Sequence, residues 1–270
     1  MKTMPTVFIP HGGGPCFFMD WNPPDTWDKQ AAHLRGLPNA IGERPKAILV
    51  LSGHWEEAIA TVQTNPAPSL LFDYGGFPAH TYELTYPALG NPDIAMRVVE
   101  LLETANIPTN MDPMRGYDHG VFIPLKVAYP KADIPVIQLS LCSDLDPDFH
   151  IAMGKALRPL RDEGVLIMGS GNTYHNMSVL MRAMHNNDRG KVAGQEFDAW
   201  LSDAVCNTDP EVRNRMLSKW AGAPGALSAH PREEHLIPLL VVAGAAGTDI
   251  GHKTLEDHVM GAVESAFQFG

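Results

Sequence analysis

Short apolar runs alternate with amphipathic segments along the whole chain. The apolar runs are rich in β-branched residues and bounded by glycine or proline, which is typical of strands buried on both faces of a parallel sheet. They predict strands at 6–10, 47–52, 134–141 and 165–168, an antiparallel piece at 58–64 and a further strand around Thr109. The remaining segments predict helices at 27–36, ending before Pro38, and at 91–105, 121–129, 149–164, 196–206, 210–221 and 235–246. This order indicates one α/β domain over 1–270, a central, mostly parallel sheet flanked by helices.

Composition and charge exclude several classes of protein. The 270 residues are 44% hydrophobic and carry a formal net charge of −11, which argues against nucleic-acid binding because that depends on surplus lysine and arginine. The longest apolar run, at 236–247, is too short to span a bilayer, and no signal-peptide core precedes Pro10. Three cysteines, odd in number and far apart, predict neither a disulfide framework nor a cysteine zinc site. We therefore expect a cytoplasmic protein without membrane contact, either a monomer or a homodimer.

Three histidines follow apolar runs at the point where a glycine-rich turn begins. His11 precedes Gly12-Gly13-Gly14, His54 follows Gly53, and His175 lies four residues after Gly171. Ligands of parallel sheets bind beyond the carboxyl ends of the strands. The placement therefore predicts a metal site at the carboxyl edge of the sheet.

Each of these histidines has a plainer interpretation. The turn after His11 resembles a phosphate-binding loop, but it has neither the Lys-Ser/Thr of a P-loop nor a Gly-x-Gly-x-x-Gly pattern. His54 alone could cap a strand, whereas as a ligand it needs an acceptor such as Glu56 or Glu57 for its second ring nitrogen. His175 fits either a ligand or a general base, because imidazole transfers protons near neutral pH.

Two further histidine segments are ambiguous. His230 and His235 are five positions apart, so on one helix they would point about 140° from each other and form no zincin site. Pro238 fits a first helical turn, which puts a helix start near His235 as a plausible further ligand and leaves His230 in the preceding loop. His119 is either a site residue or a helix-start residue capped by Asp118.

Six motifs in order carry a family resemblance. They are His11-Gly-Gly-Gly-Pro, Ser52-Gly-His-Trp, Asp73-Tyr-Gly-Gly-Phe-Pro, Gly116-Tyr-Asp-His-Gly, Ser170-Gly-Asn-Thr-Tyr-His-Asn and Glu234-His-Leu-Ile-Pro-Leu-Leu. From His11 to about Ala245 the chain resembles the class III extradiol aromatic ring-opening dioxygenases, the superfamily of the protocatechuate 4,5-dioxygenase catalytic subunit. Within it, the DODA branch of 4,5-DOPA dioxygenases is the most similar.

The resemblance implies a non-haem metal and a division of roles among five histidines. It makes His11, His54 and His235 ligands of ferrous iron, with zinc often found instead. His175 matches the acid/base histidine and is a fourth ligand when zinc is bound, and His119 matches a catalytic histidine that helps hold substrate and oxygen. The protocatechuate branch has a glutamate where this chain has His235. A site of three histidines carries one negative charge fewer than a site of two histidines and a glutamate. Such a site suits zinc as well as iron, so the native metal stays open.

The implied reaction opens the ring of a small aromatic diol, a DOPA-like catechol, with O2. We also expect Tyr117 and Phe77 to bind the substrate and the loop 73–78 to surround its side chain. Zinc alone cannot support ring cleavage, because it has no accessible redox change. Two alternatives remain at this point: a binding protein of the Memo type, similar in fold but without ring-cleaving activity, and a zinc hydrolase.

Overall fold

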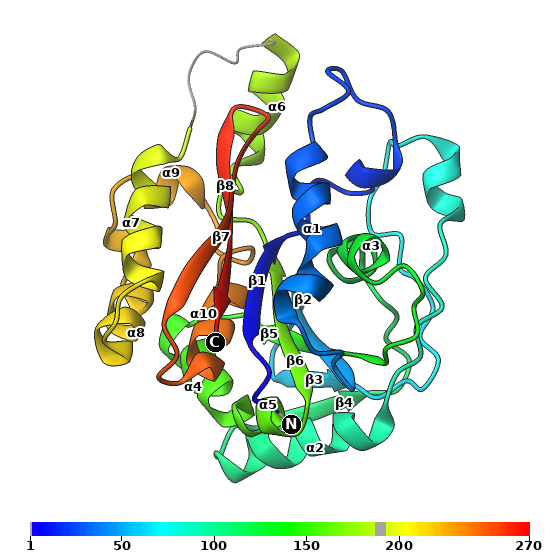
Figure 1. The fold of residues 1–270 in the computed structure, drawn as a ribbon, viewed down its shortest axis with the longest axis vertical. Coiled ribbons are helices and arrows are strands. Elements are labelled where there is room, and N and C mark those ends of the chain that lie inside the picture. Colours follow the sequence, from blue (N-terminus) through cyan, green and yellow to red (C-terminus); the bar gives the residue numbers. More distant parts are fainter. Residues whose placement is uncertain (1, 187–192) are drawn as a thin grey trace.

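The computed structural model describes residues 2–186 and 193–270, and their eight strands form one sheet (Figure 1). The strand order is β4-β3-β5-β2-β6-β1-β8-β7. The strands are β1 (Thr6–Pro10), β2 (Ala47–Glu57), β3 (Ala60–Gln63), β4 (Thr109–Asp112), β5 (Val136–Cys142), β6 (Val165–Gly171), β7 (Gly251–Val259) and β8 (Ala262–Phe269). The described α-helices are α1 (Asp28–Ile41), α2 (Pro92–Thr104), α3 (His119–Ala128), α4 (Pro147–Leu157), α5 (Pro159–Asp162), α6 (Met177–Asn186), α7 (Gln195–Val205), α8 (Pro210–Ser218), α9 (Ala226–Ala229) and α10 (Ile237–Ala246). Short 3-10 helices lie at Cys16–Phe18, Ala79–Glu83 and Trp220–Gly222.

The centre of the sheet is parallel, as predicted. β6 pairs in parallel with β1 on one side and with β2 on the other, and β2 pairs in parallel with β5. β3 and β8 flank this centre in antiparallel orientation. The carboxyl ends of β1, β2 and β6 therefore lie side by side, with β6 between the strands that lead to His11 and His54.

Helices cover both faces of the sheet (Figure 1). Ile48 and Val50 of β2 point to the face that packs against α1 and α3, while Leu49 and Leu51 point to the face covered by α2, α4 and α10. This alternation follows from the two-residue period of a strand. It explains why the strand sequences are apolar throughout, and it confirms the predicted α/β class.

Several element boundaries differ from the prediction. α1 runs through Pro38 to Ile41, because buried Leu37 and Ile41 continue its apolar face and the helix ends only at left-handed Gly42. The helix predicted at 149–164 is two helices separated at Pro159, whose ring nitrogen has no hydrogen to donate. The helix predicted at 210–221 ends at Ser218.

The C-terminal hairpin was not predicted. β7 and β8 pair in antiparallel fashion, and β8 joins the edge of β1, so the last residues of the chain complete the sheet (Figure 1). No helix within the described residues combines the length and the apolar character needed to cross a membrane.

Candidate active site

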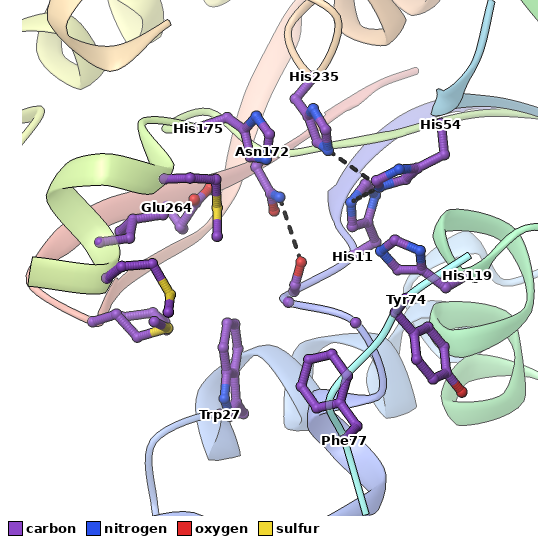
Figure 2. A pocket seen from close by; sticks show the side chains of 18 of the residues that line it. His11, Trp27, His54, Tyr74, Phe77, His119, Asn172, His175, His235 and Glu264 are labelled. Carbon is purple, nitrogen blue, oxygen red and sulfur yellow. Dashed lines mark hydrogen bonds between the residues drawn. The ribbon is translucent and has the colours of Figure 1, made fainter. Parts of the chain in front are cut away.

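Three predicted histidines meet at the carboxyl edge of the sheet. Nε2 of His54 lies 3.1 Å from Nε2 of His11 and 3.2 Å from Nε2 of His235 (Figure 2). His11 and His235 are buried, and His54 is partly buried. The three imidazoles thus turn the same ring nitrogen toward one point.

Each histidine reaches this point from a different element. His11 directly follows β1, where its backbone N–H donates to the carbonyl oxygen of Gly171 at 3.0 Å. His54 lies inside β2, which is longer than predicted and shifts register between Leu51 and Glu56. His235 lies in the turn before α10 and approaches so closely that a Cβ on Gly171 would sit 2.0 Å from its carbonyl oxygen. Gly171 therefore admits His235 to the strand edge.

Hydrogen bonds at Nδ1 set the tautomers of two of these rings. The Ser170 hydroxyl donates its one hydrogen to the carbonyl oxygen of Gly120 and so must accept, at 3.0 Å, from Nδ1 of His11. Nδ1 of His235 donates to Oε1 of Glu234 at 2.9 Å. In both rings Nε2 is left with its lone pair, directed at the common point.

This donor set fits a divalent metal. Burial, followed by the charges of the neighbouring histidines, holds the pKa of His11 well below its ordinary value, and burial likewise lowers the pKa of His235. Burial and His119 lower the pKa of His54 to about 4, against the raising effect of Asp118 and Asp73. Neutral imidazoles are the form that binds metals. Nitrogens bound tetrahedrally at ~2.0–2.1 Å from zinc lie about 3.3 Å apart, close to the separations seen here.

His119, at the start of α3, is held by Asp73 from the loop 73–78. Oδ1 of Asp73 accepts from Nδ1 of His119 at 2.8 Å and from its backbone N–H at 3.0 Å. Oδ2 of the same carboxylate lies 3.7 Å from Nδ1 of His54. Burial alone would raise the pKa of Asp73, but the hydrogen bond and charge of His119 lower it overall. Asp73 thus fixes the orientation of the His119 ring.

His175 stands beside His235. Their rings are stacked with centroids 3.4 Å apart, and Nδ1 of His175 lies 3.0 Å from Oε1 of Glu234, the atom that also binds His235. Burial opposes ionisation of Glu234, but its hydrogen bonds with the two histidines hold its pKa below the usual range. One carboxylate therefore orients two imidazoles.

The histidines open on a cavity of about 540 Å³. Its walls are largely aromatic and aliphatic, from the loop 73–78, α6, the start of α1 and the β7–β8 turn (Figure 2). The residues that line it beside the histidines include Trp21, Trp27, Tyr74, Phe77, Asn172, Met177, Leu180, Met181, Val259, Met260 and Glu264. Such a cavity is suited to a small, mostly apolar ligand.

Of the two predicted substrate contacts, Phe77 lines the cavity and Tyr117 does not. Tyr117 is fully buried in the core beside α3, where its hydroxyl donates to the carbonyl oxygen of Val136 at 2.8 Å. The prediction for Tyr117 was therefore wrong: it is near His119 in the chain, but its side chain packs into the core.

The expected partners of two histidines also differ. Glu56 pairs with Arg232 and Glu57 accepts from the Trp55 indole, so neither orients His54. Asp118 does not cap α3, because its buried carboxylate accepts instead from three side chains, those of Ser52, Arg115 and Gln138. His230 was predicted to lie in a loop; in the structure it directly follows the short helix α9 and is separate from the cluster of ligand atoms.

Sequence reasoning assigned no role to the orienting residues Asp73 and Glu234, or to Glu264. Both Asp73 and Glu234 lie within the quoted motifs; for Glu234 the available signal was its position directly before His235, whereas Asp73 has no histidine beside it in the chain. For Glu264 no local signal exists, because it reaches the cavity only through the pairing of β8 with β1.

Buried neutral imidazoles at the strand edge of an α/β sheet, beside an apolar cavity, are typical of metal-dependent enzymes that act on small molecules. The profile of the family described as catalytic LigB subunit of aromatic ring-opening dioxygenase matches residues 5–268. A 4,5-DOPA dioxygenase extradiol of Beta vulgaris is 39% identical over 248 residues, which cover 90% of this chain and 87% of the relative. A protein of the same name from Escherichia coli K12 is 35% identical over 243 residues, covering 90% of this chain and 85% of the relative.

A solved structure has the same fold as this chain. The crystal structure of an uncharacterized Escherichia coli K12 protein has a TM-score of 0.80 at 30% identity and covers 99% of this chain and 100% of that chain. The chain belongs to the family of the catalytic LigB subunit of aromatic ring-opening dioxygenases. It is an extradiol ring-cleaving dioxygenase, and of the three interpretations raised by the sequence this is the one that the comparisons support.

Proposed function

We propose that this enzyme cleaves the ring of a DOPA-like catechol with O2, using ferrous iron bound by His11, His54 and His235. The observation that carries the proposal is the convergence of three Nε2 atoms. The Nε2 atom of His54 lies 3.1 Å from that of His11 and 3.2 Å from that of His235. Names of the plant and bacterial relatives support a catechol of the DOPA type. Bound iron would supply the redox change that joins O2 to the ring, a change that zinc lacks.

The residues around the cluster divide the remaining work. His119, oriented through its Nδ1 by Asp73, turns its other nitrogen toward the space that the diol would occupy and can hold a hydroxyl or oxygen atom there. His175, oriented by Glu234, is the general base that takes a proton from the diol and returns it later. The apolar walls exclude water and hold the ring, with Phe77 and Tyr74 on one side.

We further propose that His175 becomes a fourth ligand when zinc replaces iron, since zinc prefers four tetrahedral donors. The His175 ring stacks on that of the proposed ligand His235, with centroids 3.4 Å apart, which supports this second position of the ring. We also propose a cytoplasmic location, supported by the three cysteines, all of which are free thiols.

The decisive experiment loads the protein with ferrous iron under anaerobic conditions and then adds oxygen with a panel of catechols. We expect oxygen uptake and a yellow ring-opened semialdehyde with iron, and neither with zinc alone. No uptake across the panel with iron demonstrably bound would overturn the proposal. In a parallel test, metal content should fall in His54→Ala and remain at wild-type stoichiometry in His252→Ala, an exposed histidine on β7; full stoichiometry in His54→Ala would contradict the ligand assignment.

A further inference from the structure

Glu264 of β8 lies in the wall of the cavity, although its side chain belongs to the C-terminal hairpin. The residue is only 5% exposed. Its Oε2 accepts from the backbone N–H of Thr173 at 2.9 Å and from the Thr173 hydroxyl at 3.3 Å. The backbone N–H of Tyr174 also donates to this carboxyl group. The segment Thr173–Tyr174 therefore holds the carboxyl group in the cavity wall, and none of these donors carries a positive charge.

The surroundings of this carboxylate provide no counter-ion. Apart from the histidines, Glu264 is the one residue with a carboxyl, amino or guanidinium group among the described residues that line the cavity, so no lysine or arginine is among them. Lys253, from the neighbouring strand β7, is already bound by Asp198 and Glu256. Burial raises the pKa of Glu264 to about 8 in this state. A buried carboxylate without a cation is costly, and a ligand that brings one removes that cost.

Other walls of the cavity also suit a cation. The indole rings of Trp21 and Trp27 are among the residues that line the cavity, and aromatic faces attract ammonium groups. In Figure 2, Glu264 lies on the side of the cavity away from His119 and Tyr74. An aromatic diol with its oxygens at the histidine cluster would direct its side chain away from that cluster, toward the remaining wall.

We propose that Glu264 binds an ammonium group on the side chain of the aromatic diol, so that the enzyme prefers catechol amines to catechol acids. The inference rests on the proposed ring-cleaving function of the same site and adds its selectivity. A carboxylate on the substrate would face Glu264 without a compensating cation among the described lining residues. A neutral side chain should rank between the amine and the acid, and an amino acid, with both groups, should rank below the amine.

The first test measures kcat/KM of the iron-loaded enzyme for dopamine, 4-ethylcatechol and 3-(3,4-dihydroxyphenyl)propanoate. We expect the order amine, neutral, acid for the wild type. Glu264→Gln removes the charge at nearly constant shape and should lower the amine-to-neutral ratio by about 10- to 100-fold, the usual range for a hydrogen bond to a charged group. Glu256→Gln makes the same charge change at an exposed position of β7 and should leave the ratio unchanged.

Equal loss for all three catechols in Glu264→Gln would indicate a merely structural role and overturn the proposal. So would a wild-type enzyme that prefers the acid, a result that does not depend on how any variant folds.

The second test separates this inference from the ring-cleaving function. Tyramine, a monophenol amine, should bind the metal-free protein in calorimetry more tightly than 4-ethylphenol, and Glu264→Gln should remove the difference. If no catechol is turned over but tyramine still shows this preference, the function fails and the assignment of Glu264 stands. If catechols are turned over and tyramine shows no preference, the assignment of Glu264 is wrong.

Discussion

The imidazole of His175 stacks on that of His235, with ring centroids 3.4 Å apart and planes inclined by 21°. Both rings bind the same oxygen of Glu234 through Nδ1. Their equivalent hydrogen bonds place two chemically identical groups side by side, yet the proposal gives them different roles. Only His235 has its Nε2 within 3.2 Å of another Nε2 of the cluster, which is why we assign it to the metal and His175 to proton transfer.

This division predicts the behaviour of His175→Gln. The variant should keep its iron and lose turnover by roughly 10²–10⁴-fold, the usual contribution of a positioned acid or base. Metal analysis and kcat on the same samples check both parts. His11→Ala is the matched comparison, since it should lose the metal; if His175→Gln loses iron as completely, His175 is a primary ligand.

Asp73→Asn should disturb His119 without disturbing the metal. The carboxylate accepts the Nδ1 hydrogen of His119, whereas an amide can present its NH2 group there and favour the opposite tautomer. Loss of such an orienting partner typically costs about 10–100-fold, so kcat should fall by about that factor at unchanged iron content. Asp133→Asn, at an exposed ion pair with Arg44, is the control. Wild-type kcat in Asp73→Asn would contradict the role given to Asp73.

Substitution of Phe77 should change KM, whereas substitution of Tyr117 should change the free energy of unfolding. Phe77→Ala removes an aromatic wall of the cavity and should raise KM about tenfold, with little loss of stability. Tyr117→Phe removes a buried hydrogen bond to Val136 and should lower the free energy of unfolding by about 1 kcal/mol at unchanged KM. Urea unfolding and steady-state kinetics on both variants decide this; a raised KM in Tyr117→Phe would restore Tyr117 as a substrate contact.

Glu264 should make stability depend on pH. Burial raises its pKa in the folded protein to about 8, against 4.5 as the ordinary value, so the folded state holds a proton that the unfolded state releases between these values. The stability from this group is complete below pH 4.5 and is lost as pH rises through 8. Without substrate, the unfolding free energy of the wild type relative to Glu264→Gln should therefore decrease across this window. Parallel pH profiles for the two proteins would contradict the raised pKa.

Local sequence was sufficient for the parts of the site that lie next to regular elements. The apolar, β-branched runs identified β1, β2, β5 and β6, because a strand buried on both faces has to be apolar at every position. His11 and His175 could be predicted as edge residues from the glycine turns that follow β1 and β6. Pro238 located the start of α10 to within two residues, and with it His235.

The orienting and specificity residues could not be predicted in this way. Asp73 binds His119 across 46 positions of the chain, and Glu264 binds Thr173 across 91. Tyr117 is the opposite case: it lies two positions from His119 in the chain, yet its side chain packs into the core and does not reach the cavity. Such contacts depend on strand order and on which way each chain segment turns after its strand.

The sequence by itself determined the central strands, most of the flanking helices and which imidazoles stand at strand ends, since hydrophobic period and turn chemistry act over a few residues. Only the tertiary structure decided that Glu234 serves two histidines, that Tyr117 belongs to the core and that the C-terminal hairpin closes the cavity with Glu264. These outcomes depend on packing between distant segments, where register and sheet order place each side chain, and no local pattern encodes that placement.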